Sequence, residues 1–364
     1  MRNVTLILDD GSRFPGKSFG YEKPVAGEVV FNTAMTGYPE SLTDPSYAGQ
    51  LMTLTYPLVG NYGVPPFTIE PNGLATFMES ERIHAEAIIV SDYSEEFSHW
   101  NAKESLADWL KREQVPGITG IDTRELTKVL REHGVMMGKI VFDDEPGNVP
   151  EATYAGINYV DKVSCKEVIR YNEGAGKKKV VLVDCGVKTN IIRCLLKRDV
   201  EVIRVPWNHD FTGMEYDGLF ISNGPGDPDT CDEAVQHIRK AMSLSDKPIF
   251  GICMGNQLLS KAGGAIIYKL KYGHRSHNQP VRMMGTERCF ITSQNHGYAV
   301  IGDSIDPNIA EVSHFNANDG TCEGMRYKNI NAFTVQFHPE AHGGPQDTEY
   351  LFDEFIEIIK KEMR

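Results

Sequence analysis

The stretch PIFGICMGNQ, residues 248–257, decides the fold of the second half of this chain. It begins as a short apolar strand and passes directly into the opening of a helix at Cys253. Gly251 and Gly255 flank this cysteine, as a sharp strand-to-helix turn requires. At the first turn of a helix the positive end of the helix dipole lowers the pKa of a thiol. The stretch therefore predicts a nucleophilic cysteine, and a core cysteine at a strand end is the alternative.

Short apolar runs alternate with helical patterns around this turn. The apolar runs cover residues 180–183, 200–205 and 218–221, and a helical pattern covers 189–197. Such alternation is typical of a doubly wound parallel sheet. We therefore predict that residues 179–364 form an α/β domain of this kind.

The first half of the chain has a different pattern. Strand-like segments at 4–8 and 87–90 are joined by loops rich in Gly, Pro and Tyr, and helical patterns cover 103–112 and 122–131. We predict an α+β domain over residues 1–150. The chain then becomes polar and irregular, starting at the breaker cluster DDEPG, residues 143–147, so residues 151–178 are predicted to be a linker.

Composition excludes several classes of protein. The 364 residues, 41% of them apolar, suffice for two domains, and the net charge of −13 leaves no basic stripe for nucleic acid. No stretch approaches the ~20 apolar residues of a membrane span, and no apolar segment follows Met1, so we expect a cytoplasmic protein. Seven cysteines, without a CxxC pair or metal-ligand spacing with the histidines, predict neither disulfides nor a metal site.

A candidate base lies in the stretch VQFHPE, residues 335–340. His338 and Glu340 are two residues apart, which in an extended segment places them on the same side. A carboxylate on one imidazole nitrogen orients the ring so that the other nitrogen can accept a thiol proton. We predict that Cys253, His338 and Glu340 act together; a surface turn with a solvated glutamate is the alternative. Three rival bases have no carboxylate two residues on: His296, His314 and His342.

A third motif, SNGPGDP at residues 222–228, follows the apolar run 219–221. Such a glycine-rich turn exposes backbone N–H groups that can form an oxyanion hole, where each donor lowers a barrier by about 3 kcal/mol. A phosphate-binding loop is the alternative, but neither common phosphate-loop motif is present. We therefore expect ATP to bind to another chain.

Taken together, these three motifs resemble the class I glutamine amidotransferase family. The first half is similar to the carbamoyl-phosphate synthase small-chain family in the stretches NTAMTGY (32–38), TDPSY (43–47) and YPLVGNYG (56–63), as is DCGVKTNI (184–191) in the second half. Amidotransferases of anthranilate and GMP synthases share the second half only. The resemblance thus covers nearly the whole chain.

The resemblance implies a glutaminase subunit that releases ammonia from L-glutamine through a thioester on Cys253. A large synthetase chain, paired with it in a heterodimer, would use the ammonia with ATP, Mg²⁺ and bicarbonate to make carbamoyl phosphate for arginine and pyrimidine synthesis. No cofactor is expected on this chain. The resemblance also implies that the glutamine site is lined by Ser46, Gly224, Gly226, Met254, Gln257, Asn295, Gly297 and Tyr298.

Other interpretations of these residues stay open without the family. Ser46 would be a turn or cap residue, Gln257 an exposed helix position, and residues 295–298 a turn. The chain also departs from the family pattern, with Asn256 where histidine is common and His342-Gly343 in place of Ser-Pro. Two rival functions are a stand-alone cysteine hydrolase, which would not need the first domain, and a non-catalytic module, which would not need the intact Cys253.

Overall fold

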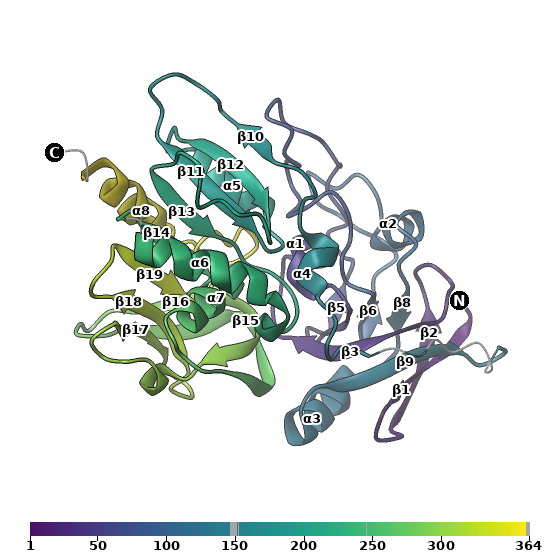
Figure 1. Ribbon diagram of the computed structural model, residues 1–364. Coiled ribbons are helices and arrows are strands. Elements are labelled where there is room, and N and C mark those ends of the chain that lie inside the picture. The colour runs from purple at the N-terminus through teal and green to yellow at the C-terminus, as the bar shows by residue number, and fades with distance from the viewer. Residues whose placement is uncertain (146–150, 152, 245, 362–364) are drawn as a thin grey trace. The chain divides into compact units, whose positions relative to one another are not determined.

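The computed structural model describes residues 1–145, 151, 153–244 and 246–361. The chain forms two compact units, Met1–Ile157 and Asn158–Arg364 (Figure 1). The predicted linker differs from this division, because α4 (Tyr159–Val163) and β10 (Ile169–Tyr171) belong to the second unit. The strand β10 pairs with the second unit's sheet, so hydrogen bonding gives order to polar residues that showed no pattern. The predicted boundary at residue 150 lies outside the described residues.

The sheet of the first unit closes into a barrel, in which no strand is left as an edge. The barrel mixes antiparallel pairs with three parallel pairs: β3 (Val25–Asn32) with β4 (Gln50–Leu54), β4 with β6 (Ala87–Ile89), and β6 with β8 (Gly117–Thr119). A parallel pair needs a crossover connection, and α1 (Tyr38–Thr43) and η1 (Pro45–Tyr47) lie in the first of these. In barrel order the strands are β1 (Asn3–Leu8), β2 (Arg13–Ser18), β8 (Gly117–Thr119), β6 (Ala87–Ile89), β4 (Gln50–Leu54), β3 (Val25–Asn32) and β9 (Met136–Phe142).

The two predicted helices of the first unit are confirmed as α2 (Leu106–Arg112) and α3 (Thr123–His133). The Asp122 side chain accepts a hydrogen bond from the Glu125 backbone N–H at 2.8 Å, so it caps α3 as the sequence predicts. The apolar face of α2 is buried in the core. The short strands β5 (Leu58–Val59) and β7 (Asp92–Tyr93) form a separate pair.

The second unit is built on a ten-stranded sheet. Five neighbouring strands are parallel, which confirms the predicted doubly wound sheet: β12 (Glu201–Pro206), β11 (Lys179–Asp184), β13 (Gly218–Ile221), β14 (Ile249–Ile252) and β19 (Ala332–Val335). The sheet continues antiparallel beyond β19, which the sequence pattern did not predict. The antiparallel strands are β18 (Cys322–Tyr327), β16 (Cys289–Val300), β15 (Ile267–Met283) and β17 (Ala310–Asn316).

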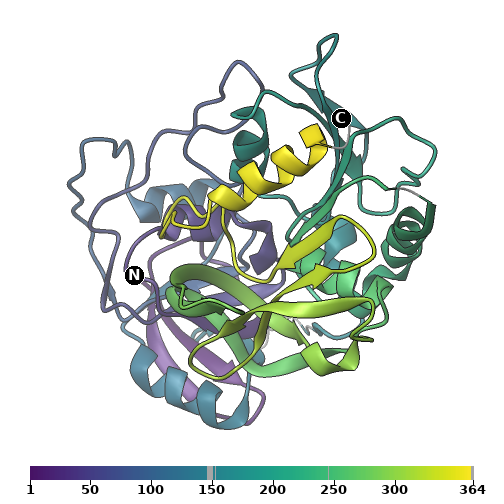
Figure 2. The same ribbon diagram turned by 90° about the vertical axis from the view of Figure 1, so that its left-hand side faces the viewer.

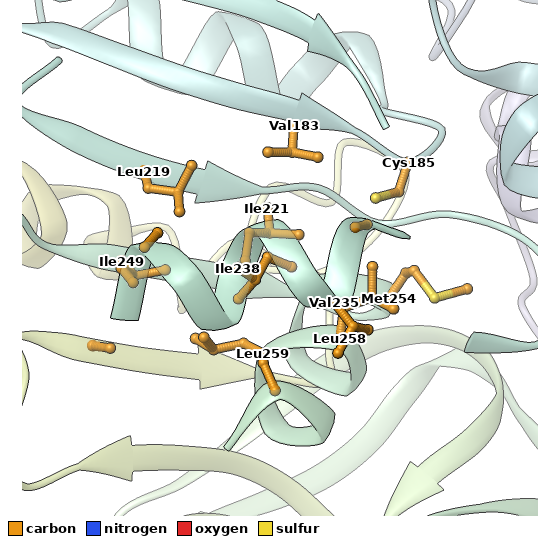
Figure 3. Close-up of a cluster of buried hydrophobic side chains, with 14 of the residues drawn as sticks. Val183, Cys185, Leu219, Ile221, Val235, Ile238, Ile249, Met254, Leu258 and Leu259 are labelled. Carbon is orange, nitrogen blue, oxygen red and sulfur yellow. The ribbon is translucent and has the colours of Figure 1, made fainter. Parts of the chain in front are cut away.

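Helices cover both faces of the parallel strands (Figures 1 and 2). The helices α6 (Asp232–Leu244) and α7 (Met254–Ala262) pack on one face. Figure 3 shows this core, in which side chains from the sheet meet those of the two helices: Leu219, Ile221, Ile249, Ile238, Leu258 and Leu259.

Aromatic side chains fill the opposite face of the parallel sheet. The ring of Phe352, on α8 (Tyr350–Lys361), stacks on Phe220 of β13 at 5.7 Å between ring centroids, and Phe355 lies 5.9 Å from Phe250 of β14. The helix α5 (Thr189–Leu196) follows β11. None of the helices in the described part of the chain is long and apolar enough to cross a membrane.

Candidate active site

Cys253 lies at the turn between β14 and α7, in a backbone conformation that is rare for a residue with a side chain. Its φ is 54° and its ψ is −103°. The Cys253 backbone N–H donates a hydrogen bond of 2.9 Å to the carbonyl of Val335, which anchors the turn to the neighbouring strand β19. Strained residues of this kind persist where the surroundings fix them, and they cluster at active sites. The structure thus supports the nucleophile turn that the sequence predicts.

The two glycines around Cys253 are required by close backbone contacts. A Cβ atom on Gly251 would lie 2.6 Å from the Gly255 carbonyl oxygen, and one on Gly255 would lie 2.1 Å from the carbonyl oxygen of Ile221. Both separations are far below a normal contact distance. The predicted need for glycine at both positions is therefore confirmed, and α7 begins pressed against β13.

Five of the other cysteines have thiols whose pKa is raised by partial or complete burial. Burial raises the pKa of the thiol well above its ordinary value in Cys185, and to about 12 in Cys165, Cys194, Cys231 and Cys322. A protonated thiol does not attack a carbonyl carbon. Cys289 is exposed and lies on a strand, without the helix N-terminus that follows Cys253.

His338 and Glu340 form the predicted pair. The Nδ1 atom of His338 lies 2.7 Å from Oε1 of Glu340, and both side chains are buried. They meet across a turn rather than along an extended segment, since the Ala341 N–H donates to the His338 carbonyl at 3.2 Å. The Nε2 atom of His338 has no hydrogen-bond partner among the described residues. This atom is therefore available to accept a proton.

Lys188 is a further member of this site, which sequence reasoning missed. Its Nζ atom lies 2.9 Å from Oε1 of Glu340. Burial raises the pKa of Glu340, but the positive charge of Lys188 and the contact with His338 outweigh burial and lower the pKa to about 2. Glu340 is thus ionised at neutral pH. Lys188 belongs to the stretch 184–191 that carries the family resemblance, but a lysine in a loop gives no sign of its partner.

All these groups follow the carboxyl ends of neighbouring parallel strands. Lys188 follows β11, the glycine-rich turn follows β13, Cys253 follows β14, and His338 follows β19. Ligands in doubly wound sheets bind at this edge. The topology therefore assembles a site from residues that are far apart in the sequence. An example is Asn190, whose side-chain amide donates to the carbonyl of Glu340, 150 positions away.

The glycine-rich turn is closely packed against the neighbouring loop. A Cβ atom on Gly224 would lie 2.0 Å from the Cys185 carbonyl oxygen, and Gly226 has a φ of +87°. The Asn223 side chain accepts a hydrogen bond of 3.1 Å from the Lys188 N–H. The turn therefore lies beside the loop that carries Lys188. Its role as an oxyanion hole stays a prediction.

The segment 295–298 on β16 contacts the nucleophile. The Cys253 Sγ atom lies 3.7 Å from the Asn295 carbonyl oxygen. The Gln257 side chain donates to the Tyr298 carbonyl at 2.9 Å, which ties this segment to α7. Gly297 lies between them and is half-buried. Asn295 thus lies next to Cys253, and Gly297 and Tyr298 follow it on β16. Contact of these residues with glutamine stays a prediction.

Three other predicted binding residues occupy different surroundings. Gln257 is buried, so the alternative of an exposed helix position is wrong. The Met254 side chain packs in the apolar core, next to Leu258 (Figure 3). Ser46 belongs to the first unit, in η1, where its N–H donates to the Asp44 carboxylate at 2.9 Å. Their contact with glutamine stays a prediction as well.

The rival bases are poorly suited to accept a thiol proton. Both ring nitrogens of His296 have partners, with Nδ1 2.8 Å from the Tyr298 carbonyl and Nε2 3.0 Å from Oε1 of Gln294. Burial lowers the pKa of His296, and burial together with Arg326 lowers that of His314 to about 4. His342 is exposed. His338 combines a buried carboxylate partner with an open ring nitrogen.

Asn256, which departs from the family pattern, has a structural role. Its side-chain amide donates to Oε1 of Gln336 at 2.9 Å and accepts from the Thr334 hydroxyl at 2.6 Å. All three side chains are buried, so these bonds join α7 to the end of β19. Asn256 therefore joins the two elements that lead to Cys253 and His338.

Two family models match the chain. One, described as "Carbamoyl-phosphate synthase small chain, CPSase domain", matches residues 6–140, and the other, "Glutamine amidotransferase class-I", matches residues 181–358. Each of these ranges lies within one unit of the structure. Together they cover most of the chain.

Three relatives illustrate the similarity. "Multifunctional protein pyr1-3" of Dictyostelium discoideum is 46% identical over 97% of this chain and 17% of its own length. The human "Carbamoyl-phosphate synthase [ammonia], mitochondrial" is 46% identical over 98% of this chain and 24% of its own length. The chain thus spans about a quarter or less of these two proteins.

The third relative is nearer in length. It is the "Carbamoyl phosphate synthase arginine-specific small chain" of Neosartorya fischeri, which is 45% identical over 98% of this chain and 80% of its own length. This similarity extends through both units and includes the strands that position Cys253, His338 and Glu340. The chain belongs to the carbamoyl-phosphate synthase small-chain family.

Proposed function

We propose that this chain hydrolyses L-glutamine to glutamate and ammonia, and supplies the ammonia to a carbamoyl-phosphate synthase large chain. The observation that carries the proposal is the strained turn at Cys253, next to the strand that leads to the His338–Glu340 pair. Family membership alone does not decide whether the chain hydrolyses glutamine. A relative whose name specifies ammonia is as similar to this chain as the others, so the nucleophile is the deciding feature.

The first half of the reaction forms a thioester. The Nε2 atom of His338 accepts the Sγ proton of Cys253, and the sulfur attacks the amide carbon of glutamine. The N–H groups of the turn at Gly224 stabilise the negative oxygen of the tetrahedral intermediate. His338 then gives its proton to the leaving nitrogen, the C–N bond breaks, and ammonia departs.

The second half releases glutamate. His338 accepts a proton from water, the resulting hydroxide attacks the thioester carbon, and the C–S bond breaks with return of a proton to sulfur. Glu340 is ionised throughout, since Lys188 and His338 keep its pKa low. It therefore stabilises the imidazolium form of His338 in both halves of the reaction.

The partner and the wider reaction are inferred from the family. The large chain would bind ATP and Mg²⁺ and use bicarbonate, and the two chains would form at least a heterodimer. The product would enter arginine and pyrimidine synthesis. The cytoplasmic location stays a prediction.

Replacement of the nucleophile tests the proposal. In a complex with a large chain, Cys253→Ser should abolish glutamine-dependent carbamoyl phosphate synthesis and leave ammonia-dependent synthesis largely intact, because the serine hydroxyl lacks thiolate character. Both rates are measured as carbamoyl phosphate formed. The matched control is Cys289→Ser, at an exposed position that should leave both rates unchanged. Wild-type glutaminase activity in Cys253→Ser would disprove the role of Cys253.

A further inference from the structure

A cluster of three buried side chains lies in the antiparallel part of the second unit's sheet. His274 on β15, His296 on β16 and Glu323 on β18 each present one ligand atom, and these atoms lie within 4.8 Å of one another. The three residues are spread over 50 positions of the sequence, so no short spacing motif indicates them. Strand pairing brings them together, since His274 lies directly opposite His296 in the ladder.

The outer nitrogen of each histidine is held by a hydrogen-bond acceptor. The Nε2 atom of His274 lies 2.8 Å from Oδ2 of Asp319, and Nδ1 of His296 lies 2.8 Å from the Tyr298 carbonyl oxygen. A ring that donates from one nitrogen directs the lone pair of its other nitrogen inward. Metal-binding histidines are commonly oriented in this way, by a carboxylate or a backbone carbonyl.

Three separations among the inward-facing atoms are close to those of a tetrahedral ligand set. Oε1 of Gln294 lies 3.1 Å from His274 Nδ1 and 3.0 Å from His296 Nε2. Oε1 of Glu323 lies 3.5 Å from His274 Nδ1. Ligands at ~2.0 to 2.1 Å from a tetrahedral zinc ion are separated by about 3.3 Å. The Gln294 amide nitrogen donates to the Thr292 hydroxyl at 3.2 Å, so its oxygen faces the cluster.

The cluster also has an excess of acceptors. Asn316 donates its side-chain amide N–H to Oε1 of Glu323 at 3.2 Å. When both rings are neutral and donate from their outer nitrogens, the two inner nitrogens, the amide oxygen and the carboxylate all present lone pairs to the same point. The Oε2 atom of Glu323 is buried and has no hydrogen-bond partner within the described part of the chain. Convergent buried acceptors repel one another unless a positive charge lies among them.

We propose that His274, His296, Glu323 and Gln294 bind one Zn²⁺ ion. Two imidazoles with oxygen ligands suit zinc, whereas Ca²⁺ and Mg²⁺ favour sites made of oxygen alone. The four ligands leave no open position, so the ion is structural. It joins β15, β16 and β18 beside Asn295, whose carbonyl contacts Cys253. The proposal reverses the expectation from cysteine and histidine spacing and is independent of the proposed reaction.

Zinc titration of the purified full chain tests this site. All proteins carry Cys253→Ser, so that zinc on the catalytic thiol is not counted. We expect one Zn²⁺ per chain by elemental analysis after gel filtration, and a thermal midpoint that rises with zinc. Co²⁺ in place of Zn²⁺ should give the visible absorption of a tetrahedral site.

Two variants separate the site from adventitious binding. Glu323→Gln should lose the bound zinc, and Asp319→Asn should weaken the affinity by ~10 to 100-fold, as loss of a hydrogen-bonded carboxylate behind a ligand does. Asp319 is partly exposed, so Asp319→Asn tests the proposal even if Glu323→Gln fails to fold. His133→Gln, at an exposed position on α3, is the matched control and should bind zinc normally.

Two results would overturn the proposal. One is a folded parent chain that retains no zinc, in which case protons on the histidines supply the positive charge. The other is zinc bound with equal stoichiometry and affinity by the parent and by Asp319→Asn and Glu323→Gln.

Discussion

His338 and Glu340 share one hydrogen bond but carry different parts of the proposed reaction. His338 moves the proton, whereas Glu340 orients the ring and stabilises its charged form. We expect His338→Asn to lower kcat by about 10⁶-fold and Glu340→Gln by about 10⁴-fold. Glutamate release by the purified variants measures both losses. The double variant should lose little more than His338→Asn alone, and a loss equal to the product of the two would argue against one shared unit.

Lys188 should control the stability of the same site. Lys188→Met removes the nearest positive charge from the buried Glu340 carboxylate, and loss of one partner of a buried pair costs ~3 to 5 kcal/mol. The free energy of unfolding in urea at neutral pH measures this cost. Lys178→Met is the matched control, because its partner Asp217 is partly exposed, and should cost ~1 kcal/mol or less.

The effect of Lys188→Met on the free energy of unfolding should depend on pH. In the folded protein the pKa of Glu340 is about 2, below its ordinary value of 4.5. A carboxyl group with a lowered pKa stabilises the fold above the ordinary value, and this contribution is lost as the pH falls through the lowered one. The difference between wild type and Lys188→Met should therefore be largest at neutral pH and shrink as the pH falls from 4.5 towards 2. A difference that does not change with pH would show that Lys188 acts through packing instead.

The contact between α7 and β13 makes a prediction at the scale of elements. Gly255→Ala would place a methyl group 2.1 Å from the Ile221 carbonyl oxygen, so the start of α7 must move away from the sheet. We expect a loss of ~1 to 3 kcal/mol in unfolding free energy and a strong loss of glutaminase activity, because Cys253 moves with the helix. Gly213→Ala, where the added methyl group meets no atom within 4 Å, should change neither quantity. An active and stable Gly255→Ala protein would contradict this account of the turn.

Elements with local signals could be predicted from the sequence, and elements defined by distant pairing could not. The turn at Cys253 and the cap at Asp122 are each encoded within a few consecutive residues. The strand β15 spans Ile267–Met283, a polar stretch that becomes a strand because it pairs with both β16 and β17. The position of Lys188 likewise could not be predicted from a local pattern. Its contact with Glu340 depends on the order of strands in the sheet, which a local pattern does not contain.

The chain as a whole contains a proposed glutaminase site and no phosphate-loop motif. We expect the purified chain, given glutamine, ATP and bicarbonate, to form glutamate slowly and no carbamoyl phosphate. Addition of a large chain should raise glutamate formation by ~5 to 150-fold, the usual range of coupling between sites. The assay follows glutamate and carbamoyl phosphate in parallel. Carbamoyl phosphate made by the single chain would disprove the proposal that glutamine hydrolysis and carbamoyl phosphate synthesis belong to two different chains.

The first unit shows the limit of sequence reasoning at this scale. Its α2 and α3 helices follow from amphipathic patterns, but the closed barrel does not. The barrel needs β1 to pair with β9, which lies more than 120 residues away, and β2 to pair with β8. The family resemblance of the stretches at 32–38 and 56–63 identified the unit without giving its topology.

The burial of the cysteines has a consequence for chemical labelling. Five thiols should resist alkylation, because burial raises their pKa, and Cys253 is only 2% exposed at the end of its strand. A bulky maleimide or a solid-phase thiol resin would therefore report on the surface residue Cys289. A small electrophile shaped like glutamine would instead be carried to Cys253 by the site itself. The two kinds of reagent would count different sulfur atoms in the same protein.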